Sequence, residues 1–126
     1  MVSDWKNNID KYKEMRKYRK MHRKHRKELI ELAKKDREWD WGYLQDLVLA
    51  KIRHMHEYYT LGYNVWQTDE TRTQIIESLQ HVLDLQEKID KIWLDEETCM
   101  NKWLIEQELY KEMYSYIGSE MTKWWD

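Results

Sequence analysis

The chain has 126 residues, 41% of them hydrophobic and 37% charged, with a formal net charge of −2 at pH 7. This length suits one domain with a moderate core, and the apolar and aromatic content excludes a disordered chain. One cysteine excludes a disulfide framework within the chain, and no apolar run approaches the roughly 20 residues of a membrane-spanning helix. The first residues also lack a signal-peptide pattern, so we expect a cytoplasmic protein that does not enter the membrane.

The charges are divided unevenly along the chain. Residues 1–37 hold 14 basic and 6 acidic side chains, a balance of +8, whereas residues 38–126 hold 8 basic and 18 acidic ones, a balance of −10. Such a division is typical of a segment that binds a partner. The alternative is that the basic segment pairs with the acidic remainder of the same chain or of a second copy.

Residues 5–37 predict one long helix, since they contain neither glycine nor proline. Apolar and aromatic side chains recur there at steps of three and four, the period of one helix face. The set is Trp5, Ile9, Tyr12, Tyr18, Met21, His22, His25, Leu29 and Leu32. This stripe is thinner in the middle, so we expect a helix that is anchored at both ends and strongly cationic between them.

A second helix is predicted between Asp40, a good N-terminal cap, and Gly62, a natural helix stop. Its expected core stripe is Trp41, Leu44, Leu47, Val48, Leu49, Ile52, Met55 and Tyr59. Residues 63–69 are then expected to form a loop that holds Trp66.

Two further helical patterns follow this loop. Thr71 and Gln74 have the spacing of a capping box and predict the start of the third helix. Its apolar stripe is Ile75, Ile76, Leu79, Val82, Leu83, Ile89, Ile92 and Trp93. The stripe of the fourth helix is Met100, Trp103, Leu104, Tyr110, Met113, Tyr114 and Ile117, and Gly118 is expected to end it. The break between the two is weak, so one bent helix is the alternative.

These elements predict an all-α fold, a bundle of three or four helices in one domain that covers residues 1–126. We divide it into the long basic helix at 1–37, a helical core at 38–118 and an aromatic tail at 119–126. Trp124 and Trp125 in this tail are expected to dock on the core or on a partner. The aromatic ends of the first helix favour a homo-oligomer.

The run KYRKMHRKHRK at residues 17–27 is the main candidate for function. On a helix, Arg16, Arg19, Arg23 and Arg26 share one side, and Lys17, Lys20, Lys24 and Lys27 line an adjacent one. Arginine forks clamp phosphate at two points, and the interleaved Tyr18, His22 and His25 are able to stack on a base. The run therefore predicts a phosphate-binding surface, with a merely solvated helix face as the alternative.

Tyr43, Trp66 and Lys51 complete the predicted ligand-binding residues. Tyr43 and Trp66 lie off the expected core stripe or in a loop, and two such rings are able to sandwich a nucleobase. Stacking of that kind is worth ~1–3 kcal/mol per base.

Nothing in the sequence predicts catalysis, a metal or another cofactor. Nucleophile motifs and glycine-rich phosphate loops are absent, and Cys99 lies beside acidic residues that disfavour a reactive thiolate. The pairs His22/His25 and His54/His56 are incomplete as metal sites, the first being surrounded by cations. Asp84, Glu87 and Asp90 match half of the Mg²⁺ site of helical nucleotide pyrophosphohydrolases, but the second half is missing.

The stretch that begins Trp39-Asp40-Trp41 and continues through Tyr43 and Leu44 resembles small helical proteins encoded by bacteriophages, with Lys51 and Met55 as further matching positions. Residues 75–92 match the second helix of that pattern, so the resemblance covers residues 39–93. It implies a phage accessory protein that acts in the cytoplasm of a bacterial host. By analogy, such proteins inhibit host defence by blocking a defence protein or by sequestering a nucleotide signal.

The expected function is thus a non-catalytic binding protein that sequesters a phosphorylated, nucleotide-like signal in basic and aromatic pockets. Two alternatives stay open. One is nucleic-acid binding through the basic helix at residues 11–27, and the other is a protein decoy that docks on an acidic host factor.

Overall fold

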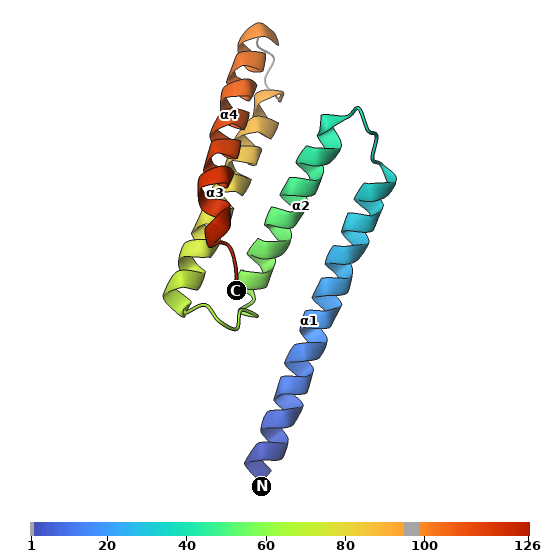
Figure 1. Cartoon of the computed structure of the whole chain (residues 1–126), viewed down its shortest axis with the longest axis vertical. Coiled ribbons are helices and arrows are strands. Elements are labelled where there is room, and N and C mark those ends of the chain that lie inside the picture. The colour runs from blue at the N-terminus through green and yellow to red at the C-terminus, as the bar shows by residue number, and fades with distance from the viewer. Residues whose placement is uncertain (1, 95–98) are drawn as a thin grey trace. The chain divides into compact units, whose positions relative to one another are not determined.

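The computed structural model describes residues 2–94 and 99–126, and it describes side chains in 8–94 and 100–126. Over these residues the chain forms four α-helices: α1 (Val2–Lys34), α2 (Trp41–Thr60), α3 (Asp69–Ile92) and α4 (Cys99–Glu120). A 3₁₀ turn, η1 (Met121–Lys123), precedes the end of the chain, and no described residue is in a strand (Figure 1). The predicted all-α class is confirmed. None of the described helices combines the length and apolarity that crossing a membrane requires.

Local chemistry explains where α2 begins and ends. The Asp40 carboxylate accepts a hydrogen bond from the Gly42 N–H at 2.9 Å, as expected of a residue that caps a helix. Gly62 follows the helix with φ of +77°, the left-handed conformation that favours glycine after a helix end. Both predicted boundaries of the second helix are therefore confirmed.

The predicted start of α3 at Thr71 is wrong by about one turn. The N-terminal cap is Thr68, whose side chain accepts from the Thr71 N–H at 3.2 Å, and Asp69 and Glu70 occupy the first turn. Acidic side chains are favourable at this position, because the helix dipole is positive there. Thr71 and Gln74, whose spacing we read as a capping box, lie inside the helix, in its first and second turns.

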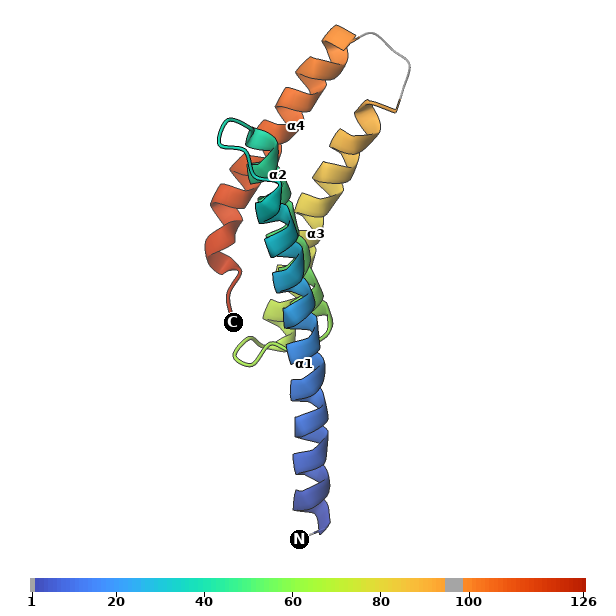
Figure 2. The same cartoon turned by 90° about the vertical axis from the view of Figure 1, so that its right-hand side faces the viewer.

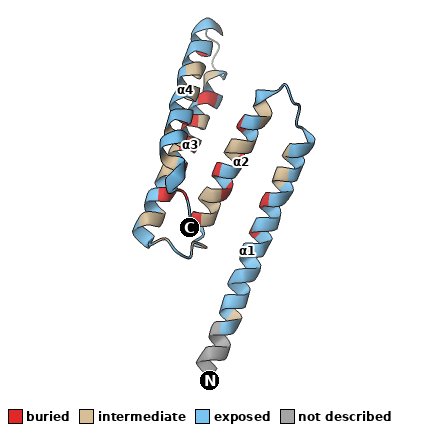
Figure 3. Ribbon diagram, viewed as in Figure 1, coloured by how far each residue is buried: buried red, intermediate tan, exposed pale blue. Residues whose placement is uncertain are grey.

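The chain divides into two compact units, Met1–Ala50 and Lys51–Asp126. The first contains α1 and the first half of α2. In this unit the buried α1 side chains are Met21 and His25, near the middle of the helix (Figure 3). Tyr12, nearer the N-terminal end, is 63% exposed, and Leu29 and Leu32 toward the other end are half-buried. The side chain of Trp5, the first residue of the predicted stripe, lies outside the described part, so the expected anchoring of the helix at both ends stays a prediction.

The second unit contains the remainder of α2, followed by α3, α4 and η1. Its α3 and α4 lie side by side and run in opposite directions in both views (Figures 1 and 2). Their buried apolar side chains are Ile75, Leu79, Val82, Leu85, Ile89 and Met113. Four of the α3 residues belong to the predicted stripe. Leu85 was not predicted, although it lies three residues after Val82 and four before Ile89 and so fits the same helical spacing.

Several predicted core residues lie on the surface instead. Those with about half or more of their surface exposed are Trp41, Leu44, Trp93, Met100, Trp103 and Leu104, and Tyr114 is 40% exposed. Gly118 does not end α4, which continues to Glu120. Glycine permits a helix stop but does not impose one, and η1 prolongs the turn. The two C-terminal helices are separate, and residues 95–98 between them lie outside the described part of the chain.

Candidate functional site

The four arginines of the basic run form one exposed ridge on α1. At 100° per residue, Arg16, Arg19, Arg23 and Arg26 fall within an arc of roughly 80°, and they span roughly 15 Å of the helix axis. All four are exposed, whereas the ion pairs described on α1, Lys17–Glu14 and Lys34–Glu31, are formed by lysines. We call the four arginines the arginine ridge.

The ridge faces away from the buried side of α1. Met21 and His25, which are 8% and 7% exposed, lie roughly 160° around the helix from its centre. The guanidinium groups therefore point toward solvent along a convex surface. This arrangement leaves the ridge open to a ligand, although it does not enclose one.

Lysines and aromatic rings flank the arginine ridge on its two sides. Lys17, the lysine nearest the N-terminal end of the run, pairs with Glu14 at 3.3 Å, an exposed contact worth little in free energy. On the other flank the rings of Tyr18 and His22 stack, with centroids 6.0 Å apart and planes inclined by 13°. His22 is exposed whereas His25 is buried, so these two histidines do not form a pair at the surface.

The remaining predicted ligand residues are spread over other elements. Tyr43 lies half-buried in the first turn of α2, within the first unit. Lys51, exposed on α2, and Trp66, 77% exposed in the loop between α2 and α3, belong to the second unit. The structure gathers six of the nine predicted residues on α1, and the role of the other three at the same site stays a prediction.

Within the described residues, no group of three histidine, cysteine or acidic side chains has an arrangement that would hold a metal ion. Asp84 and Asp90 on α3 accept hydrogen bonds from Gln80 and Gln86, at 2.9 and 2.8 Å. Glu87 pairs with Lys91 at 2.8 Å, which raises the pKa of that lysine. The acidic triplet is thus a hydrogen-bonded helix surface. The side chain of Cys99 lies outside the described part.

A second polar constellation, which the sequence did not reveal, lies where the tail meets the loop between α2 and α3. The Asp126 carboxylate accepts hydrogen bonds from the N–H groups of Val65 and Trp66, both at 2.6 Å, and of Gln67, at 3.1 Å. The Tyr58 hydroxyl donates a fourth, at 2.6 Å. We call these four donors the carboxylate site. No local motif could have revealed it, since its partners are about 60 positions from Asp126 along the chain.

The carboxylate site changes the acidity of its groups. Desolvation acts to raise the pKa of Asp126, but the hydrogen bonds from Tyr58 and from the three N–H groups outweigh it, so the pKa is lowered. The pKa of the neighbouring Tyr59 is raised, first by burial and second by the negative charge of Asp126. The carboxylate is therefore ionised over the whole neutral range.

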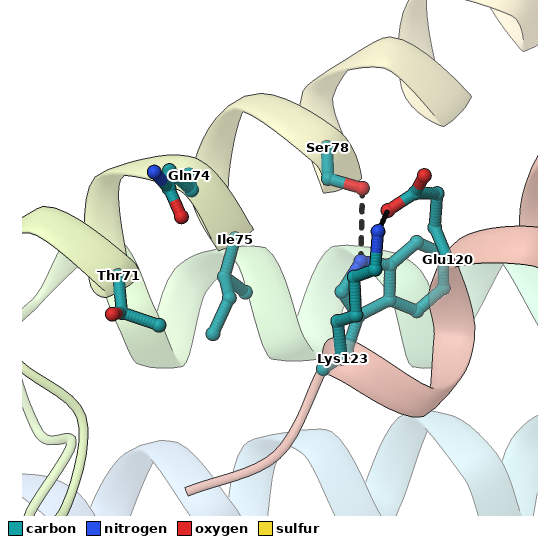
Figure 4. A pocket seen from close by; sticks show the side chains of 7 residues that line it. Thr71, Gln74, Ile75, Ser78, Glu120 and Lys123 are labelled. Atoms are coloured by element: carbon teal, nitrogen blue, oxygen red, sulfur yellow. Dashed lines mark hydrogen bonds and ion pairs between the residues drawn. The ribbon is translucent and has the colours of Figure 1, made fainter.

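Trp124 closes a small pocket next to this site. Its indole Nε1 donates to the Ser78 hydroxyl at 2.9 Å, and a cavity of about 160 Å³ lies beside it (Figure 4). Thr71, Gln74 and Ile75 from α3 line the cavity, together with Glu120 and Lys123, which form an ion pair at 3.1 Å. Trp124 thus docks on the core of its own chain, one of the two arrangements expected from the sequence, while Trp125 is 60% exposed.

No known protein family, curated protein or solved structure matches this chain.

Proposed function

We propose that the protein is a non-catalytic binding protein whose arginine ridge takes the phosphate groups of an extended polyanion, with nucleic acid as the ligand class. One observation carries the proposal: Arg16, Arg19, Arg23 and Arg26 are exposed along one line, opposite the buried side of α1. A ridge of roughly 15 Å spans several phosphates of a nucleic-acid strand, whose charges repeat every few ångströms.

The convex form of the ridge favours an extended polyanion over a small ligand, which a pocket would have to enclose. A small molecule needs a concave site that surrounds most of its surface. A backbone of repeated phosphates needs only a line of positive charge, and the guanidinium forks add two-point contacts. Release of the counterions condensed on the polyanion then supplies much of the affinity.

The test is fluorescence anisotropy of labelled single-stranded DNA, duplex DNA and RNA over a series of salt concentrations. We expect a linear fall of log affinity with log salt concentration. Changing the four arginines to glutamine should weaken binding by at least roughly tenfold. The matched control changes Lys17, Lys20, Lys24 and Lys27 to glutamine, which removes the same charge and should cost less. A folded protein that leaves the anisotropy of all three nucleic acids unchanged at low salt would refute the proposal.

A nucleotide-like ligand is the second candidate, supported by the Tyr18–His22 stack beside the ridge. A base stacked on these rings would place its phosphate near Arg19 or Arg23. Titration with mononucleotides and cyclic dinucleotides decides between nucleic acid and a free nucleotide as the ligand. If the ligand is a free nucleotide, the wild type should bind it and Tyr18→Ala should not. The resemblance to phage proteins supports a setting in which that ligand is a signal of host defence.

A further inference from the structure

The carboxylate site is built like a receptor for an oxyanion. Three consecutive backbone N–H groups, from Val65, Trp66 and Gln67, converge on the two carboxylate oxygens of Asp126. Successive N–H groups of this kind form a concave donor surface that suits a carboxylate or a phosphate. The Tyr58 hydroxyl supplies a fourth donor from α2, so the donors come from a helix as well as from a loop.

Its present occupant is held by a short tail with a few contacts. The Gln67 side chain donates to the Trp125 carbonyl at 2.6 Å, and the Trp124 indole donates to Ser78 at 2.9 Å. Between α4 and Asp126 lie η1 and the residues Trp124 and Trp125. Apart from the buried Trp124, these last residues bury little apolar surface, and Trp125 is 60% exposed.

A separate observation next to the loop concerns Arg72. Its guanidinium lies against Gly62, close enough that a Cβ added there would be 3.3 Å from Nη1. Its Nε is a buried donor without an acceptor among the described residues, and its ion pair with Asp69 is long, at 3.6 Å. Buried donors are rarely left unused, so the Nε of Arg72 is a donor whose partner the described residues do not supply.

We propose that the loop at residues 65–67, together with Tyr58, is a binding site for a single oxyanion group, and that the tail is a displaceable strap that competes for it through Asp126. The ligand class is a carboxylate or a phosphate monoester. Binding of such a group and docking of the tail exclude each other, because both need the same N–H groups. Displacement would withdraw Trp124 from Ser78 and uncover the α3 face that lines the 160 Å³ cavity.

Competition by the tail sets the anion concentration that is needed to occupy the site. A ligand tethered by a short segment acts at an effective concentration on the order of millimolar. An untethered anion must exceed this value in the wild-type protein, whereas the Asp126→Ala protein lacks the competitor. Removing the carboxylate should therefore raise the apparent affinity for a small oxyanion by roughly tenfold or more.

The experiment is a titration of the full-length, isotope-labelled protein with sodium phosphate and, separately, sodium acetate, followed by amide NMR signals. Sodium chloride at equal ionic strength is the control. We expect the signals of Val65, Trp66 and Gln67 to shift at lower anion concentration in Asp126→Ala than in the wild type. In the wild type, the Trp124 indole signal should move with them. A response to acetate alone, or to phosphate alone, identifies which oxyanion chemistry the site takes.

Two results would overturn the proposal. One is a folded Asp126→Ala protein whose three loop amides respond to neither anion. The other is a loop that loses its signals in Asp126→Ala and does not regain them when either anion is added. Tyr58→Phe removes one donor without changing the loop, so it should weaken the anion response of Asp126→Ala, and an unchanged response would exclude Tyr58 from the site.

Discussion

Ser78 on α3 and Trp124 in the tail are joined by a hydrogen bond of 2.9 Å, across 46 positions of the chain. The same Ser78 hydroxyl oxygen also accepts from the Tyr116 hydroxyl on α4, at 3.0 Å. One side chain therefore ties α3 to both α4 and the tail. Its loss would leave two part-buried donors without their acceptor.

Ser78→Ala is expected to lower the free energy of unfolding by about 1–3 kcal/mol, since unpaired buried donors cost more than a hydrogen bond gains. Urea denaturation followed by circular dichroism measures the change. Ser115→Ala, an exposed serine on α4, is the matched control and should have little effect. Equal stability of the two variants would mean that neither donor depends on Ser78.

Asp126→Asn should destabilise the protein by about 1 kcal/mol at neutral pH, because the site lies at the surface and solvent weakens charged hydrogen bonds there. The pKa of Asp126 is lowered from 3.8 in the folded state, so its contribution is fully present above this ordinary value. It is lost as the pH falls through the lowered pKa. Unfolding free energies of the wild type and the variant should therefore differ at pH 7 and converge in strong acid. A constant difference at all pH values would contradict this linkage.

The phenol of Tyr59 should titrate above the ordinary pKa of 10.0, because burial and the Asp126 charge both raise its pKa. In Asp126→Asn, Tyr59 is still buried but the negative charge beside it is gone. The pKa of Tyr59 should therefore fall part of the way back toward 10.0. Ultraviolet absorbance of tyrosinate measures it, with Tyr59→Phe identifying the signal. Tyr114, whose pKa is raised by burial alone, is the internal control and should not move. The stability linked to Tyr59 is present below pH 10 and is lost as the pH rises through the raised pKa.

Leu79→Ala is expected to cost about 2–5 kcal/mol, since Leu79 is fully buried and its truncation leaves a cavity in the α3 core. Leu94→Ala makes the same chemical change at a side chain that is 81% exposed and should stay within about 0.5 kcal/mol of the wild type. The same denaturation experiment measures both. If both variants lost a similar amount of unfolding free energy, Leu79 would not be a core residue.

Arg23→Gln should reduce the slope of log affinity against log salt concentration by about one, as expected for loss of one phosphate contact. Lys34→Gln is the comparison, because Lys34 lies beyond the ridge and already pairs with Glu31 at 3.1 Å. Anisotropy titrations at several salt concentrations give the slopes. If both variants change the slope equally, binding depends on the net charge of α1 and not on the position of the arginine ridge.

The sequence predicted features that depend on neighbouring residues. The Asp40 cap and the Gly62 stop are confirmed because a few adjacent groups determine them. The arginine spacing likewise predicted one helix side. It could not show that Met21 and His25, on the opposite side, are the buried residues of this helix, because burial depends on which elements pack against it.

The carboxylate site marks the limit of such prediction. Its donors are mostly backbone N–H groups, which every residue other than proline carries, so residue identity gives no sign of it. Trp124 and Trp125 did indicate a docking tail, but the partner surface on α3 is about 46 positions away. Non-local contacts of this kind follow from the fold and not from a local pattern.

The buried residues of α3 also bear on how this protein can change in length. Ile75, Val82 and Ile89 are all buried and lie seven positions apart. Seven residues make nearly two whole turns, so a block of that size returns the helix to almost the same orientation. An insertion or deletion of seven residues in α3, matched in α4, would preserve which side of each helix meets the other. A change of one or two residues would rotate charged positions into the seam, so length variation here should come in whole heptads.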